Sequence, residues 1–197
     1  MREIHWQENI LNTEKTIITI SGTDNFFCNY LEPIIKDILL KTQLQFIPRS
    51  LRIHVFSGMT LPEVYKKCLK EKRAQECHSI VFCSGSCIRM LTGTKNYERA
   101  LFIEKESSVL EIYTAILQWL RDYNSIPGLH ITTALKARDY PVMHIVINGR
   151  SPSFESRKYS RDKKTVYGWL SQFADRIGTR NRQETYLKTR LVIGGIK

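Results

Sequence analysis

The sequence has no hydrophobic run long enough to cross a bilayer, and it is poor in glycine and proline. Its apolar stretches are short and interrupted by charge, whereas a membrane-spanning helix needs about 20 apolar residues. With 10 Gly and 6 Pro in 197 residues, the chain is neither collagen-like nor of low complexity. The first residues lack the apolar core of a signal peptide. We therefore expect a folded cytoplasmic protein that does not bind membranes.

Cysteines are few and unevenly spaced. The five are Cys28, Cys68, Cys77, Cys83 and Cys87. An odd number without a signal peptide argues against a disulfide framework. The group formed by Cys77, His78, Cys83 and Cys87 suggests zinc, but structural zinc sites usually take their ligands in close pairs from tight turns. Because Cys83 also falls in an apolar run, we expect reduced core thiols, with no metal ion and no cofactor.

Acidic residues are scarce in the C-terminal third. Residues 130–197 carry 14 Lys and Arg against 5 Asp and Glu, whereas residues 1–129 carry 16 against 14. Most of the net charge of +11 therefore lies in the shorter segment. A basic module joined to a near-neutral one indicates a polyanion partner, most often nucleic acid, although a merely soluble basic surface has the same charge.

Short β-rich runs alternate with helical patterns in the first part of the chain. Strands are predicted at 16–20, 51–56, 79–83 and 100–103, with a weaker one at 44–47. Helices are predicted at 26–40, 61–73 and 108–121. This alternation predicts an α/β domain over residues 1–122, a flavodoxin-like parallel sheet with functional groups at the carboxyl ends of its strands.

The residues at those strand ends are Gly22, Thr23, Ser57, Ser84 and Lys105. Their order and intervals resemble the receiver domain of two-component response regulators, although any flavodoxin-like sheet shows the same alternation. The resemblance implies a degenerate receiver that keeps the Ser and the Lys and lacks the acidic pair and the phosphoacceptor Asp. Because receiver phosphorylation needs an Asp nucleophile and acidic Mg²⁺ ligands, we expect no Asp-phosphate switch.

Signatures of enzyme active sites are also missing. The sequence contains no phosphate-binding glycine loop, dinucleotide fingerprint, HExxH motif or nucleophile elbow. Ser84 and Lys105 could form a Ser–Lys pair, but the receiver resemblance accounts for both residues. We expect that the protein is not an enzyme.

Helix start and stop signals follow a linker predicted at residues 123–131. Asp139 as a cap, with Pro141 in the first turn, predicts a helix over 142–147 that Gly149 ends. Ser151 and Pro152 begin a second short helix, which runs to Tyr159. Asp162 caps a third helix, which Gly178 ends. Asn181 and Glu184 form a capping-box pattern for a fourth helix, although residues 191–193 are also compatible with a strand.

The third helix has two distinct faces. Its apolar stripe consists of Val166, Trp169, Leu170, Phe173, Ala174 and Ile177. The opposite face carries Lys163, Lys164, Thr165, Tyr167, Gly168, Ser171 and Gln172. With the tight break before it, this helix fits a helix-turn-helix module whose cationic face enters a DNA major groove. A solvated basic helix in a small bundle is the competing interpretation.

The run Lys164-Thr165-Val166-Tyr167-Gly168-Trp169, followed by Phe173 and Arg176-Ile177-Gly178, resembles the signature of LuxR/FixJ (NarL)-type DNA-binding domains. The resemblance covers about residues 133–193 and implies an all-α four-helix domain at 132–197, with its recognition helix at about 163–177. It implies base contacts from Tyr167, Gly168 and Ser171, with Gln172 on the same face. Phosphate contacts would come from Lys163, Lys164, Thr165 and Arg176. Dimers would pack through about residues 182–192.

The sequence departs from this family pattern in places. The Thr and Glu that usually open the first helix are replaced around residues 136–141. The apolar pair of the second helix falls on Glu155 and Ser156, and we expect Phe154 and Tyr159 to substitute for it. Trp169 replaces the common His. Because Gly168 offers no side chain, specificity would depend more on DNA shape or on a partner subunit.

These patterns predict a sequence-specific transcriptional regulator that acts without Asp phosphorylation and associates with the nucleoid. It would bind double-stranded promoter DNA as a homodimer or with a response-regulator partner of the same family. It is similar to the small enterobacterial regulators of fimbriae, capsule and acid resistance. The alternative is a basic interaction module that binds RNA, a membrane surface or an acidic protein.

Overall fold

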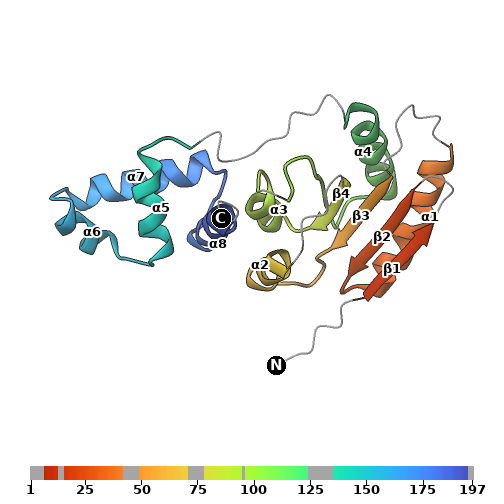
Figure 1. The fold of residues 1–197 in the computed structure, drawn as a ribbon, viewed down its shortest axis with the longest axis horizontal. Coiled ribbons are helices and arrows are strands. Elements are labelled where there is room, and N and C mark those ends of the chain that lie inside the picture. The colour runs from red at the N-terminus through yellow and green to blue at the C-terminus, as the bar shows by residue number, and fades with distance from the viewer. Residues whose placement is uncertain are drawn as a thin grey trace. The chain divides into compact units, whose positions relative to one another are not determined.

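The computed structural model describes residues 7–12, 16–41, 49–70, 78–94, 96–123 and 135–194 (Figure 1). The chain divides into two compact units, residues 1–88 with 99–128 and residues 89–98 with 129–197. Within the described ranges, every helix is too short or too polar to cross a membrane.

A five-stranded sheet forms the centre of the first unit. Its strands lie in the order β1 (Gln7–Asn12), β2 (Ile17–Gly22), β3 (Ser50–Val55), β4 (His78–Cys83) and β5 (Leu101–Glu104). The last four are parallel, and β1 runs antiparallel to β2. The parallel sheet with its alternating helices confirms the predicted flavodoxin-like character. The predicted strand at 44–47 lies outside the described residues.

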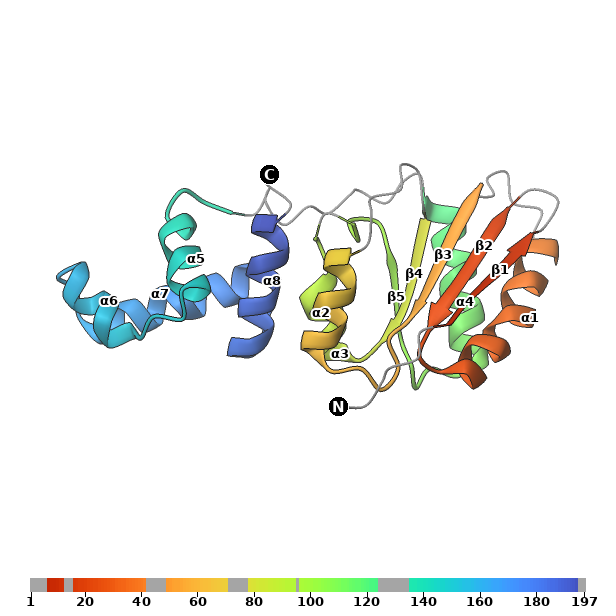
Figure 2. The same ribbon diagram turned by 60° about the horizontal axis from the view of Figure 1, so that its bottom comes forward.

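Helices cover both faces of this sheet (Figure 2). They are α1 (Asn25–Lys41), α2 (Leu61–Lys70), α3 (Gly85–Leu91) and α4 (Val109–Asp122). α1 and α4 pack on one face, where they share a core with β2, β3 and β4. α2 and α3 lie on the other face. Ser108 and Glu111 form a capping box at the start of α4, which explains why this helix begins sharply.

Four cysteines, Cys28, Cys68, Cys83 and Cys87, are buried free thiols. A hydrogen bond with Cys83 and burial raise the pKa of the Cys87 thiol. Burial, together with the nearby Asp24 carboxylate, raises the pKa of Cys28 to about 11. Because the thiolate is the reactive form, both groups are poor nucleophiles at neutral pH. The prediction of core thiols is confirmed for these four, and Cys77 lies outside the described residues.

The second unit contains α5 (Asp139–Ile147), α6 (Pro152–Lys158), α7 (Lys163–Arg176) and α8 (Arg182–Gly194). Three of these helices share one core, formed by Val142 and Met143 of α5, Phe173 and Ile177 at the end of α7, and Val192 of α8. Of the two alternatives for residues 191–193, the strand is wrong, because these residues continue α8.

Three of the predicted helix ends have the expected local geometry. The Ser151 hydroxyl accepts a hydrogen bond from the Phe154 N–H at the start of α6. The Asn181 side chain accepts one from the Glu184 N–H at 2.9 Å before α8. Gly178 has a φ of +69°, and the Thr179 N–H closes the end of α7 on the Ala174 carbonyl at 2.9 Å.

Gly22, the last residue of β2, is paired with Val55, the last residue of β3. A Cβ at this position would lie 2.7 Å from the Val55 Cβ and 2.9 Å from the Val55 carbonyl oxygen. Both atoms belong to the rigid part of a central strand, so they have little freedom to move away. The end of β2 therefore has no room for any side chain, and in particular none for a carboxylate.

We predict that Gly22→Ala destabilises the first unit by about 1–3 kcal/mol, because the added methyl must displace β3. Lys105→Ala, at an exposed position after β5, should change the free energy of unfolding by less than about 0.5 kcal/mol. Chemical denaturation measures both. An unchanged midpoint for Gly22→Ala would contradict the close approach of the two strands.

Candidate nucleic-acid interface

α7 buries one face and exposes the other. Val166 and Phe173 are buried, as is Ile177 just beyond the helix end. The opposite face exposes polar or charged groups along its length: Lys163, Lys164, Thr165, Tyr167, Ser171, Gln172 and Asp175. This division matches the two faces predicted from the spacing of apolar residues. The residues of the candidate interface therefore lie on a helix that is anchored from behind.

Tyr167 and Gly168 lie next to each other in α7, directly after its first turn. The Tyr167 side chain is 60% exposed, which leaves its ring and hydroxyl available to a partner. Nothing lies within 4 Å of a Cβ built on Gly168, so packing within the protein does not require glycine there. The backbone of α7 is consequently accessible at this point.

Positive charge is concentrated at the start of α7. Lys163 and Lys164 are exposed in its first turn, and Arg157, Lys158 and Arg161 are exposed just before it. Asp175 carries a negative charge at the other end of the same face. The sequence analysis did not include this residue in the site. A carboxylate at that position repels phosphate and can accept a hydrogen bond from the cytosine amino group.

Arg176 is turned toward the interior of the unit. Its guanidinium contacts both carboxylate oxygens of Asp139, and its Nε donates to Oδ2 at 3.0 Å. The Lys136 backbone N–H donates to the same oxygen at 2.8 Å. Asp139 is fully buried, and the Arg176 side chain is 20% exposed. The guanidinium for which we predicted a phosphate contact is therefore engaged in tying α7 to α5.

Asp139 does not cap its helix as predicted. Arg138 occupies the cap position, and Asp139 is the first residue of α5. Burial raises the pKa of the Asp139 carboxyl, but hydrogen bonds from Arg176 and from the Lys136 N–H outweigh it, and the pKa lies below its usual value. The available sequence signal was an acidic residue before the first apolar turn together with an arginine in the last turn of α7.

The buried residues of α6 differ from those expected. Glu155 is 1% exposed and Ser156 is also buried, whereas Phe154 is 53% exposed. The prediction that Phe154 replaces the buried pair is wrong, because positions 155 and 156 lie on the buried face of α6 and Phe154 lies on its exposed face. Arg150 lies 3.4 Å from the Glu155 carboxylate and over the Phe154 ring. Tyr159 contacts Trp169 of α7 edge to face.

In the first unit, the predicted receiver-like residues follow the carboxyl ends of neighbouring strands. The Thr23 hydroxyl donates to the Ser57 carbonyl at 2.7 Å and so links the ends of β2 and β3. Lys105, exposed after β5, lies 3.5 Å from the Glu106 carboxylate. Ser84 is exposed between β4 and α3. Gly22, at the end of β2, packs closely against Val55 of β3.

Comparisons with protein-family models, with curated proteins and with solved structures found no match. Function must therefore be inferred from the geometry of the site.

We predict that Asp139→Asn lowers the free energy of unfolding of the second unit by about 3–5 kcal/mol, because it leaves the Arg176 charge without its buried partner. Asp175→Asn, an equivalent change on the exposed face of α7, should have an effect below about 0.5 kcal/mol. Thermal unfolding followed by circular dichroism compares the two. Equal effects would show that the buried ion pair does not anchor α7.

The same contact should be sensitive to acid. Since the folded-state pKa of Asp139 is lowered, its stabilisation is complete above the unfolded-state pKa of about 3.9. It is lost as the pH falls through the folded-state pKa. Asp139→Asn should therefore flatten the stability profile of the second unit below about pH 4.

Proposed function

We propose that this protein is a sequence-specific DNA-binding transcriptional regulator in which α7 enters the major groove. The observation that carries the proposal is the arrangement of α7, whose exposed cationic and hydrogen-bonding face is held from behind by a buried stripe and by the Asp139–Arg176 pair. An α-helix with its side chains is about 10–12 Å across. That matches the major groove of B-DNA, which is about 12 Å wide.

The residues of this face have distinct roles in the proposal. Lys163, Lys164 and Thr165 contact phosphates, which position the helix without selecting sequence. Tyr167, Ser171 and Gln172 face the base edges. A glutamine can bind adenine through two hydrogen bonds, and an aromatic ring can contact the thymine methyl group. With Gly168 contributing no side chain, sequence-dependent DNA shape supplies the rest of the specificity.

The excess of basic residues in 130–197 supports the same function. Phosphate contacts release counterions, so binding should weaken steeply with salt. The family resemblance adds that α6 and α7 form the helix-turn-helix and that dimers pack through α8, as a homodimer or with a response-regulator partner.

The first unit, in this proposal, is a receiver-like regulatory domain without an Asp-phosphate switch. The close packing at Gly22 supports this role, because the first acidic position of a receiver has no room for a side chain here. Regulation would then come from partner binding or from a ligand.

We predict that Lys164→Ala weakens binding to duplex DNA of every sequence. The magnitude of the negative salt slope, d log K/d log [salt], should decrease by about one unit, because one phosphate contact is lost. Fluorescence anisotropy over a range of salt concentrations measures both quantities. Lys66→Ala, at an exposed position on α2, is the matched control and should change neither. An unchanged slope for Lys164→Ala would remove this residue from the interface.

Binding partners of another class would change the conclusion. If the full chain binds no duplex DNA at physiological salt but retains binding to RNA, to anionic vesicles or to an acidic protein, the basic helices form an interaction module of a different kind. The same anisotropy assay with labelled RNA, and co-sedimentation with vesicles, distinguish these cases.

A further inference from the structure

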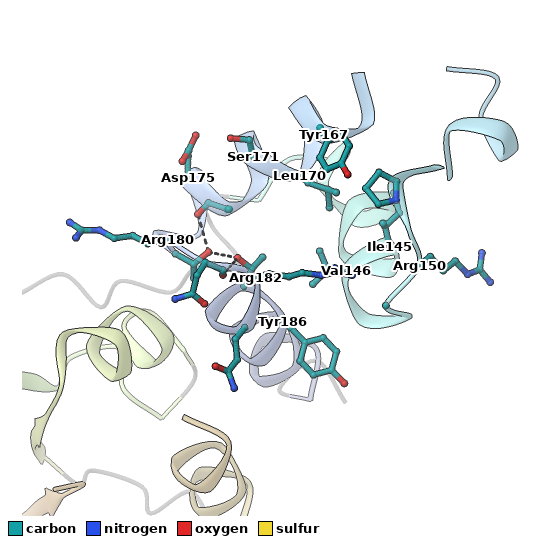
Figure 3. A pocket seen from close by; sticks show the side chains of 17 residues that line it. Ile145, Val146, Arg150, Tyr167, Leu170, Ser171, Asp175, Arg180, Arg182 and Tyr186 are labelled. Carbon is teal, nitrogen blue, oxygen red and sulfur yellow. Dashed lines mark hydrogen bonds between the residues drawn. The ribbon is translucent and has the colours of Figure 1, made fainter. Parts of the chain in front are cut away.

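A groove of about 910 Å³ lies within the second unit, between α5, α7 and the first turn of α8 (Figure 3). Apolar side chains from α5 and α7 line much of it: Ile145, Val146, Leu170 and Ala174. Pro152 lines it from the start of α6, and Tyr167 and Tyr186 add aromatic rings. Its size and largely apolar lining are typical of sites for small molecules, which occupy about 300–1,000 Å³.

One cation extends into this groove. Arg182 begins α8, and its side chain reaches across toward Val146 of α5 (Figure 3). Arg180, two residues earlier, points away from the groove in the same view, and so does the Asp175 carboxylate. The third arginine that lines the groove among the described residues, Arg150, pairs with Glu155 and also points away. The groove therefore combines apolar walls with the inward-directed guanidinium of Arg182.

The segment that carries Arg182 is held in place by several hydrogen bonds. The hydroxyls of Thr179 and Thr185 are 2.8 Å apart, and the Thr185 hydroxyl also donates to the Asn181 carbonyl at 2.8 Å. The Asn181 side chain caps the Glu184 N–H. Because these hydrogen bonds fix the turn before α8, they fix the place where the Arg182 side chain leaves the helix.

We propose that this groove binds a small amphipathic carboxylate. The carboxylate pairs with the Arg182 guanidinium, whose planar donors match its two oxygens. The aliphatic or aromatic body lies against Val146 and Leu170. A fully charged ligand would lose its hydration against the apolar walls, and a wholly apolar one would form no ion pair with the exposed Arg182. The groove thus favours a molecule that has one anionic end.

The position of the groove also gives the ligand a regulatory role. Tyr167 and Ser171 line the groove and belong to the face assigned to DNA. A bound carboxylate would therefore compete with DNA for these side chains. This second statement rests on the proposed DNA binding, whereas the existence of the ligand site does not.

The site is tested with octanoate and, as its uncharged analogue, 1-octanol. Either is titrated into the isotope-labelled full chain, and the NMR shifts of the Val146 and Leu170 methyl groups are followed. Octanoate should bind saturably with a Kd in the millimolar range or below, as expected for about ten heavy atoms. Arg182→Gln should weaken octanoate binding by up to about fivefold, as expected for an ion pair of an exposed arginine. Arg157→Gln, at an exposed arginine of α6 outside the groove lining, is the control and should not change octanoate binding, and octanol binding should remain unchanged in both variants.

Three results would overturn the site. They are the absence of saturable shifts in the wild-type chain, equal weakening of octanoate binding by Arg157→Gln and Arg182→Gln, and a loss of octanol binding in a folded Arg182→Gln protein. As an independent check, Val146→Trp should fill the groove and abolish binding of both ligands, and continued octanoate binding by this variant would place the ligand elsewhere.

Competition is measured separately by anisotropy with labelled DNA. Octanoate that saturates the wild-type chain should lower its DNA affinity, and the same concentration should lower that of Arg182→Gln less. An unchanged wild-type affinity would overturn the competition. If the wild-type chain binds no DNA at all, the proposed function fails, and the NMR titration still decides whether the groove binds the carboxylate.

Discussion

The buried contact between Asp139 and Arg176 holds the end of α7 against the start of α5. It joins the first residue of α5 to the last residue of α7, at the same end of the core that Met143, Phe173 and Ile177 form. A buried charge without its partner is costly, so each group holds the other in position. With this end of α7 fixed, its apolar stripe packs inward and its polar face turns to solvent. The candidate interface depends on that orientation.

The exposed face of α7 combines positive charge, an aromatic ring and hydrogen-bonding side chains. Two lysines stand in its first turn, and a largely exposed tyrosine and two uncharged hydrogen-bonding side chains follow. In the proposed function, the tyrosine ring contacts a thymine methyl group. Gly168 adds no side chain to this face, and the Asp175 carboxylate repels phosphate. In the proposed function, DNA shape or a partner subunit therefore supplies part of the specificity.

Much of the fold could be predicted from the sequence because the relevant signals are local. A β-branched run favours a strand by itself, as at residues 16–20. A cap residue marks the start of its own helix, as Ser151 and Asn181 do. β1 and α3 were missed. β1 contains Gln, Glu and Asn and is specified by pairing with β2, and α3 is a helix of only 7 residues. The helical state of residues 191–193 likewise depends on continuing α8 rather than on their own β propensity.

The exposed residues of the candidate site could be predicted from the sequence, but the buried ion pair behind them could not. Periodicity separates the two faces of α7, so the exposed residues could be named in advance. The family resemblance implied a phosphate contact for Arg176, and periodicity contains no information on ion pairs between helices that could have shown that Asp139 binds it. The burial of Glu155 instead of Phe154 could not be predicted from the hydrophobicity of single residues.

Binding selection by the full chain from a pool of random duplex DNA, at about 150 mM salt, where non-specific phosphate contacts are weakened, tests the central claim most directly. The account predicts enrichment of a short motif, with two half-sites about one helical turn apart if the protein binds as a dimer. Substitutions at Tyr167, Ser171 and Gln172 should then change the motif. Retention of DNA with no enriched motif, or no retention at all, would contradict sequence-specific recognition by α7.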